Sequence, residues 1–182
     1  LRQKISTVNN EIKMRINPNI KIKDLIISGI YGKFCRIENY NKKDLKLVHE
    51  LTKKMHISGI IDKKFGNLSD GEKQISLIAR AIINNPEILI LDEPTINLDL
   101  KSKIFLIDKI QELSKRKTTL LCITHDVELI TNEYNRVILL KDRKIIADGK
   151  PDKIMKSKNI NNLFDINIKL LKYKKNYTIS RL

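Results

Sequence analysis

The sequence is poor in cysteine, glycine, proline and aromatic residues. Its 182 residues include two cysteines, six glycines, four prolines and no tryptophan, and 5% of the residues are aromatic. Cys35 and Cys122 lie far apart and belong to no C-x-x-C pair, which favours a reducing compartment over a disulfide-stapled secreted domain. The lack of aromatic side chains leaves few platforms on which nucleic acid bases can stack.

Long apolar runs and a signal-peptide pattern are also lacking. No run approaches the roughly 20 residues that a membrane-spanning helix needs. The hydrophobic and charged fractions of 41% and 31% are ordinary for a globular domain, and the length suits one domain with a real core. The chain opens on Leu1 rather than on methionine, which suggests a fragment.

Acidic residues are outnumbered by basic ones, 21 to 36, which gives a net charge of +15. Such a balance often indicates a nucleic acid partner. Here the lysines are spread from Lys4 to Lys175 among isoleucine and asparagine residues. A solvated basic surface is the better interpretation, and no nucleic acid partner is expected.

The first half of the chain reads mainly as helix. A short strand is expected at 4–8, and apolar residues recur at helical spacing over 21–30 and 41–57. The segment "LSDGEKQISLIARAIINNP" predicts a helix that begins with a capping box, with Ser69 as N-cap and Glu72 three residues on.

The second half alternates between strand and helix patterns. We expect strands at 87–92 and 118–124, helices at 100–116 and 126–133, and two strands at 135–140 and 144–149 around a polar turn. Such an alternation predicts a parallel sheet covered on both faces, with a helical segment at about 14–85 inserted into it. Residues 151–182 show weak periodicity and stay unassigned.

Polar side chains end two of the predicted strands. Asp92 and Glu93 follow "ILIL", and His125 follows the next strand. Ligands of open parallel sheets sit beyond the carboxyl ends of the strands. Asp92 is therefore a candidate Mg²⁺ ligand, Glu93 a general base for water, and His125 a hydrogen-bond donor to developing phosphate charge. An acid pair can also simply open a loop at Pro94, but the apolar run, the pair and "PT" together favour a catalytic site.

The stretch "LSDGEKQ" is a second candidate site. A helix N-terminus offers unpaired N–H groups and a positive dipole end, which suit a phosphate group. Capping alone explains Ser69 and Glu72, but it does not explain Gly71, which removes a side chain where a ligand approaches the backbone.

Four motifs together resemble those of one family. "LSDGEKQ" resembles the ABC signature motif, "ILILDE" the Walker B strand, "PTINLD" the D-loop and "ITHD" the H-loop, all in the family's order and spacing. Over residues 3–157 the chain is similar to the nucleotide-binding subunit of ABC transporters. The resemblance implies an α/β P-loop NTPase (RecA-like) fold, with a parallel sheet and an inserted ABC α-helical subdomain, present as a partial domain.

The resemblance also implies a domain plan and a set of site residues. The plan is a core strand and Q-loop region at 1–13, a helical subdomain at 14–85 that ends in the signature helix, a RecA-like core at 86–150, and a C-terminal extension at 151–182. The resemblance further implies a dimer of two such subunits that sandwiches two ATP molecules. In that dimer the residues that contact the partner's ATP are Leu68, Ser69, Asp70, Gly71 and Glu72, and the D-loop consists of Asn97, Leu98 and Asp99. Asp92 would bind Mg²⁺, Glu93 the attacking water and His125 the γ-phosphate. The signature departs from the family pattern at Asp70, where glycine is usual.

The Walker A motif G-x-x-x-x-G-K-[ST] is absent from these residues. Gly32–Lys33 is a GK pair, but the preceding glycine is Gly29, Phe34 stands where Mg²⁺ needs a hydroxyl group, and a helical pattern precedes it. The Q-loop glutamine position falls on Asn10, or on Lys13 if the loop is longer. An N-terminally truncated ATPase domain is the simplest interpretation, and either a degenerate gene or an incomplete sequence would produce it.

The leading functional hypothesis is an ATP-hydrolysing subunit that powers an ABC membrane transporter, although the chain alone is expected to be inactive without Walker A. Its expected partners are a second ATP-binding subunit, identical or not, and transmembrane permease subunits. It is expected in the cytoplasm, bound to the inner face of the membrane through the permease. "IKIKDLIISGIYGKF" resembles the metal-chelate and molybdate types. The alternatives are a soluble non-transport ABC ATPase and a non-catalytic remnant that contributes only its signature face to a dimer.

Overall fold

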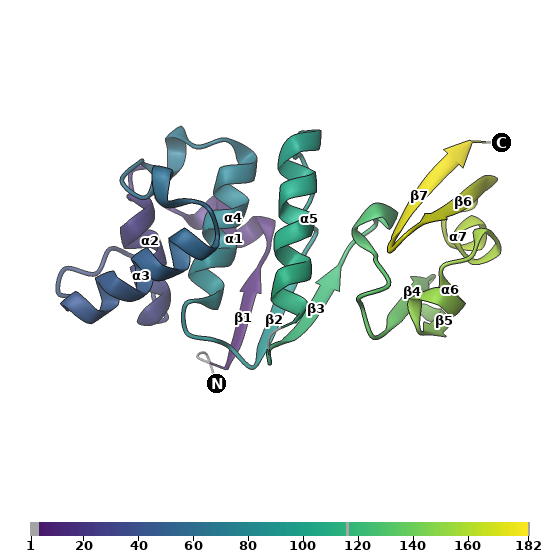
Figure 1. The fold of residues 1–182 in the computed structure, drawn as a ribbon, viewed down its shortest axis with the longest axis horizontal. Helices are drawn as coiled ribbons and strands as arrows, with labels where there is room; N and C mark the ends of the chain where they lie inside the picture. The colour runs from purple at the N-terminus through teal and green to yellow at the C-terminus, as the bar shows by residue number, and fades with distance from the viewer. Residues whose placement is uncertain (1–3, 116, 182) are drawn as a thin grey trace. The chain divides into compact units, whose positions relative to one another are not determined.

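A computed structural model describes residues 4–115 and 117–181. The chain divides into two compact units, Leu1–Ile123 and Thr124–Leu182, and each is described by itself. The first unit contains β1 (Ile5–Val8), α1 (Asn10–Arg15), α2 (Ile22–Ile30), α3 (Lys42–Lys54), the 3₁₀ turns η1 (Ser58–Ile60) and η2 (Phe65–Asn67), α4 (Asp70–Ile82), β2 (Ile88–Asp92), α5 (Leu100–Ser114) and β3 (Thr119–Ile123) (Figure 1). The second contains η3 (Val127–Leu129), β4 (Val137–Lys141), β5 (Lys144–Gly149), α6 (Pro151–Ile154), α7 (Ser157–Phe164), β6 (Ile168–Tyr173) and β7 (Asn176–Arg181).

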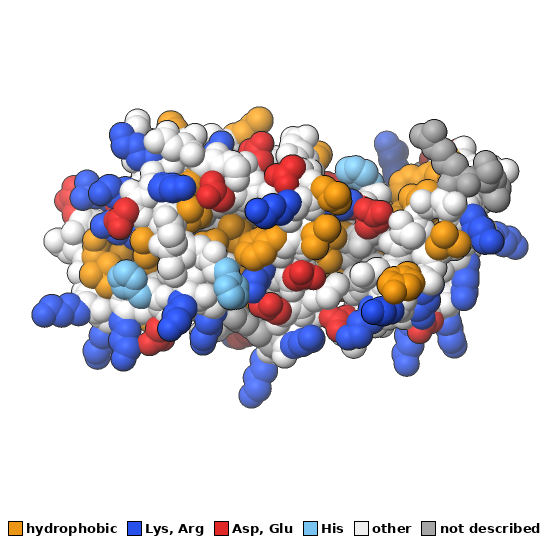
Figure 2. Space-filling model, turned by 45° about the horizontal axis from the view of Figure 1, so that its top comes forward, with side chains coloured by type: hydrophobic (Ala, Val, Ile, Leu, Met, Phe, Trp, Pro, Cys, Tyr) orange, Lys and Arg blue, Asp and Glu red, His pale blue; other side chains and the backbone are white. Residues whose placement is uncertain are grey.

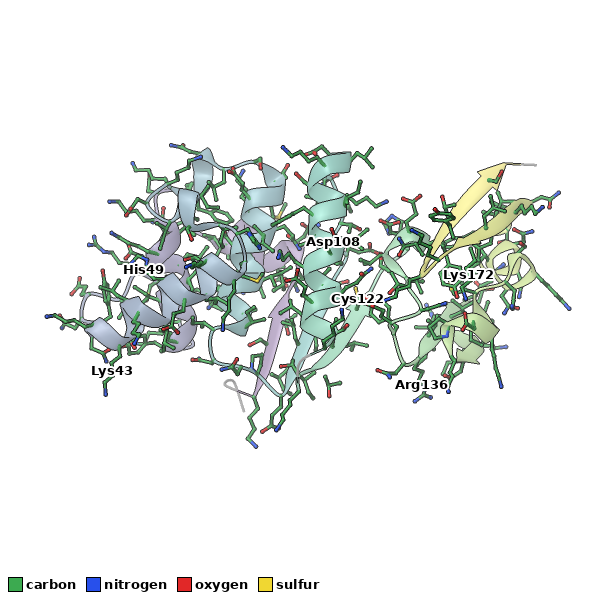
Figure 3. All side chains as sticks on the ribbon, viewed as in Figure 1. Lys43, His49, Asp108, Cys122, Arg136 and Lys172 are labelled. Carbon is green, nitrogen blue, oxygen red and sulfur yellow. The ribbon has the colours of Figure 1, made fainter. Side chains whose placement is uncertain are left out.

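The first unit is built on a three-stranded parallel sheet in the order β1-β2-β3. β2 is the central strand, and its Leu89 and Leu91 are 1% and 0% exposed. In the same face lie Val8 of β1 and Cys122 of β3 (Figure 3), because both pair in register with Leu91. α4 packs against β1, and α5 packs against β3 and α4. The predicted parallel sheet is confirmed, and these two helices cover one of its faces.

The opposite face of the sheet is only partly covered. It carries Ile5, Leu121 and Ile123, which are 40%, 50% and 49% exposed, and Asp92 lies in this face because it pairs with Ile123. The prediction of a sheet covered on both faces is therefore wrong for the described residues. A run of apolar residues identifies a strand in the sequence, but it does not show which helices cover the two faces of the sheet.

The inserted helical segment is held together by one buried arginine. Arg80 of α4 donates a hydrogen bond of 3.2 Å to the Ser28 hydroxyl group and one of 2.7 Å to the Lys33 carbonyl, and its guanidinium lies 3.9 Å from the centre of the Phe34 ring. Burial lowers the pKa of Arg80 to about 10, so it stays charged at neutral pH. These contacts tie the end of α2 and the loop after it to the signature helix.

Gly32 confirms that "SGIYGKF" is not a phosphate loop. It follows the end of α2, not a strand, and its φ of +62° is the left-handed conformation that glycine adopts easily. The preceding glycine, Gly29, faces α4: a Cβ there would lie 2.3 Å from the Arg80 carbonyl oxygen. The backbone conformation of Gly32 and the packing of Gly29 against α4 therefore explain why glycine occupies these two positions.

The second unit has a small core of its own. Two antiparallel hairpins, β4–β5 and β6–β7, pack with α6 and α7, so the lysine-rich end of the chain is ordered into regular elements. Tyr177 is buried in this core and donates hydrogen bonds to Asn132 and Asp152. Burial, with the nearby Asp152 carboxylate, raises the pKa of Tyr177 to about 12.

The predicted helix at 126–133 is wrong. The structure has only the short turn η3 there. Val127, Leu129 and Thr131 are buried at every second position, and Thr131 forms a β-bridge with Asn176. A spacing of two residues suits extended backbone packed on a neighbouring strand, whereas a helix needs apolar residues three and four apart.

Leu91→Ala should destabilise the protein far more than Leu121→Ala. The first change empties a fully buried site in the central strand, which costs about 2–5 kcal/mol. The second removes a half-exposed side chain from the uncovered face and should cost less than about 1 kcal/mol. Urea unfolding followed by circular dichroism measures both; equal losses would contradict the assignment of the two faces.

Candidate functional site

The two adjacent carboxylates lie at the carboxyl end of the central strand. Asp92 is the last residue of β2, and Glu93 begins the turn that leaves the sheet. The Glu93 N–H donates a hydrogen bond of 2.9 Å to the Ile123 carbonyl. Glu93 has a φ of 48°, a left-handed conformation that is uncommon outside glycine and is often found at functional sites. The end of β2 and this hydrogen bond therefore fix the backbone positions of the two acidic residues.

The predicted D-loop leads from Glu93 to the start of α5. Asn97 also has a left-handed backbone, with φ of 61°. Asp99 is the N-cap of α5: its carboxylate accepts hydrogen bonds from the Ser102 N–H at 3.0 Å and from the Ser102 hydroxyl at 2.7 Å. The hydrogen bond from the Ser102 side chain is the main reason why the pKa of Asp99 lies below its usual value. Sequence reasoning missed this capping role, although an aspartate ahead of an amphipathic run is its usual signal.

The signature helix begins with the predicted capping box. The Glu72 N–H donates to the Ser69 hydroxyl at 3.2 Å, and the Ser69 N–H donates to the Glu72 carboxylate at 2.9 Å. Ser69 and Asp70 are exposed, whereas the Leu68 side chain is 5% exposed and belongs to the core. The exposed start of α4 thus consists of backbone N–H groups and short polar side chains.

Gly71 is the point where the predicted signature motif contacts the helix that follows the predicted D-loop. A Cβ on Gly71 would lie 2.5 Å from the Ser102 Oγ and 2.6 Å from its Cβ, distances that real side chains do not tolerate. The first turns of α4 and α5 therefore touch, as the adjacent helices in Figure 1 show. The glycine is needed for this close approach within the chain, a reason that the sequence did not reveal.

The Q-loop candidate Asn10 is exposed and is the first residue of α1. Its neighbour Asn9 caps this helix by accepting a hydrogen bond of 2.9 Å from the Ile12 N–H. Lys13, on the same helix, places its Nζ 2.8 Å from the Asp70 carboxylate. Lys13 is the main reason why the pKa of Asp70 is lowered. This pair joins α1 to the signature helix and was not predicted.

His125 lies in the second unit, two residues beyond β3, and its side chain is exposed. The residue before it, Thr124, accepts a hydrogen bond of 2.9 Å from the Asp126 N–H. The other predicted site residues belong to the first unit. Within that unit, the structure brings Asp92 and Glu93 together at the strand end, and Gly71 and Asp99 together through Ser102.

The donor groups suit a magnesium ion that arrives with a nucleotide. Among the described residues, no group of three or more histidine, cysteine, aspartate or glutamate side chains can hold a metal ion. Mg²⁺ in nucleotide sites commonly uses one or two carboxylates and takes its other ligands from phosphate oxygens and water. Asp92 at the end of β2 fits such a site.

Basic and acidic residues lie among one another on the face of the protein that Figure 2 shows. Figure 2 shows Lys and Arg side chains spread over the visible face with acidic side chains between them. In the second unit, Arg136 is held by Asp148 through hydrogen bonds of 2.7 and 2.6 Å, and Lys172 by Asp152 at 2.5 Å (Figure 3). This distribution agrees with the interpretation of a solvated basic surface.

Comparison with known proteins decides the family. The model of the family described as ABC transporter matches residues 1–96, the part that holds the signature helix and the acid pair. The chain belongs to the ABC transporter family. It is related to the ATP-binding subunits of that family, as the names of its relatives state.

Two relatives show how far the similarity extends. An uncharacterized ABC transporter ATP-binding protein, YmeB of Lactococcus lactis, is 33% identical over 181 residues, which is 98% of this chain and 70% of the relative. The zinc uptake system ATP-binding protein ZurA of Listeria monocytogenes is 33% identical over 129 residues, which is 70% of this chain and 50% of the relative. The chain thus spans between half and seven-tenths of these two proteins.

A solved structure confirms the fold class. The ATP-binding chain of a transporter assigned to the metal-chelate ABC type, in an inward-facing conformation, superposes with a TM-score of 0.80 at 22% identity, over 97% of this chain and 70% of that one. The P-loop NTPase fold, as a partial domain, is therefore confirmed. No helix among the described residues is long and apolar enough to cross a membrane.

Gly71→Ala should damage the start of α4, although alanine is normally the better helix former. The new methyl group would collide with Ser102, so we expect a loss of stability of about 1–3 kcal/mol. Gly59→Ala is the matched control, because nothing lies within 4 Å of its Cβ position. Ser102→Gly should restore part of the loss in the Gly71→Ala background. Thermal unfolding of the parent and the three variants measures this, and equal melting temperatures for Gly71→Ala and Gly59→Ala would contradict the close contact.

Proposed function

We propose that this chain is the energy-coupling part of an ABC transporter, in which ATP binding and hydrolysis drive a membrane permease. The observation that carries the proposal is the contact between Gly71 and Ser102. It sets the start of the signature helix beside the D-loop helix, whose loop leads back to the acid pair. Residues with three different family roles thus share one edge of the first unit.

The acid pair supplies the chemistry of hydrolysis. Asp92 would hold Mg²⁺, which supplies charge neutralisation to the nucleotide phosphates when it is bound. Glu93 orients and deprotonates the attacking water, and His125 donates a hydrogen bond to the phosphate on which negative charge develops. The backbone N–H of Glu93 is held by the Ile123 carbonyl at the end of the sheet, so the residue directly follows Asp92 in a fixed turn.

The signature helix serves the ATP of a second subunit. Ser69, Asp70, Gly71 and Glu72 present a capped helix N-terminus to solvent, and such an end attracts phosphate through its N–H groups and its dipole. Asn97, Leu98 and Asp99 lie on the same side and would meet the partner subunit. The partner is a second ATP-binding subunit, identical or not.

The transported substrate is a metal ion or a metal chelate. The Listeria relative is named for zinc uptake, and a Bacillus subtilis relative, 26% identical over 149 residues, is named a probable siderophore transport protein. The chain would then work at the inner face of the cell membrane, attached through the permease.

A second candidate function is a non-catalytic subunit that supplies only its signature face to a composite ATP site. It is favoured by one observation: the start of α4 is capped by residues of its own first turn, so the signature face is complete within this chain.

Glu93→Gln should separate the two functions. In a fusion that adds a P-loop segment ahead of Leu1, the exchange should lower ATP turnover by about 100-fold or more and leave ATP binding unchanged, because only the base is lost. Phosphate release and nucleotide binding are measured in parallel, with Glu87→Gln as a control at the opposite end of β2. Turnover within a few-fold of the parent would remove Glu93 from catalysis and favour the second function.

The 182 residues by themselves should bind Mg–ATP no more tightly than about 1 mM, or about −4 kcal/mol. A P-loop normally contributes its lysine and a row of N–H groups to the phosphates, and without them Asp92 and Glu93 present only negative charge. Isothermal titration calorimetry measures the affinity. A micromolar dissociation constant would contradict this expectation.

A further inference from the structure

Asp70 puts a carboxylate where a phosphate group would bind. It is the first residue of α4, and its side chain is 48% exposed. An acid in this position stabilises the helix through the dipole, but it also repels an incoming phosphate. The capping-box residue Glu72 adds a second carboxylate to the same turn. A phosphate site at this helix start therefore needs compensation for its own negative charge.

Lys13 supplies a positive charge at this point. Its Nζ lies 2.8 Å from the Asp70 Oδ1, and its side chain is 19% exposed, so it is more enclosed than its partner. The lysine is 57 residues away in sequence and is positioned by α1, which Asn9 caps and after which Ile16 enters the core. Lys63 lies 3.9 Å from Glu72, so the second carboxylate also has a cation near it.

We propose that Lys13 is a positioning residue of the signature site, which neutralises Asp70 so that the phosphate of the partner's ATP can approach the first-turn N–H groups of α4. This inference rests on the proposed function of the signature helix. The same ion pair fastens α1, the segment directly after β1, to α4. None of the residues of α1 is itself buried, and the pair is a side-chain contact between these two helices.

The test is a titration of the 182-residue chain with tripolyphosphate, followed by ¹H–¹⁵N NMR at constant ionic strength. The amide signals of Gly71, Glu72 and Lys73 report on the helix start itself, so binding to lysines elsewhere does not disturb the measurement. Lys13→Ala should weaken the apparent affinity at these amides by about threefold to tenfold, the range expected for an ion pair near the surface.

Lys23→Ala is the matched control. Lys23 forms a comparable pair with Asp62 at 3.0 Å in the same unit, so this variant loses the same charge from a pair that includes no residue of α4. Its affinity at the Gly71 amide should stay within twofold of the parent. Dispersed spectra of each variant establish that it is folded.

The double variant Lys13→Ala with Asp70→Asn separates charge compensation from packing. If Lys13 acts by neutralising Asp70, the removal of the carboxylate restores the affinity to at least the parent value, although the ion pair is absent. If the double variant binds as weakly as Lys13→Ala, Lys13 acts in another way and the inference is wrong. Equal affinities of Lys13→Ala and the parent would also overturn it.

A failure of the proposed function looks different. In that case the amide signals of Gly71 and Glu72 do not shift on addition of tripolyphosphate in any of the variants, including the double variant that lacks the Asp70 carboxylate. The reason would be that the helix start does not bind phosphate at all. That result would overturn the proposed contact with ATP and the inference together, whereas a failure of the inference alone leaves phosphate binding in place.

Discussion

The first turns of α4 and α5 meet at Gly71 and Ser102, and no side chain fits between them. This contact fixes where two helix starts lie relative to each other, and each start is capped within its own turn, by Ser69 and by Asp99. The sheet below orders the same edge, because β2 is held on both sides and ends in Asp92. Packing of one glycine against one serine thus sets the two helix starts side by side, and the sheet places the acid pair at the end of β2.

Local patterns were read correctly from the sequence, and contacts between distant residues were not. The capping box and the strand that ends in the acid pair are encoded within a few residues, and both are confirmed. The helix expected at 126–133 failed because Thr131 pairs with Asn176, a residue far along the chain. The partly covered face of the sheet likewise depends on how the helices pack against the strands.

The sequence yields a candidate role for each site residue, but it does not reveal the contacts that hold these residues in place. Asp99 was assigned to a dimer interface, and the structure adds that it caps its own helix. Gly71 was assigned to ligand approach, and the structure adds that it makes room for Ser102. Lys13 and Asp70 are 57 residues apart in the sequence, so no short window of sequence contains the pair. Side chains in this site therefore carry structural and functional demands at once.

The left-handed backbone of Glu93 shows how these demands conflict. Glycine would adopt that turn with less strain, and it would fit the hydrogen bond to Ile123 equally well, because only the backbone N–H takes part. A glutamate in this place makes the turn less stable than it needs to be for folding alone. Selection for the most stable sequence would therefore erase this carboxylate. A variant designed on folding energy alone would be drawn toward losing the residue that we propose as the general base.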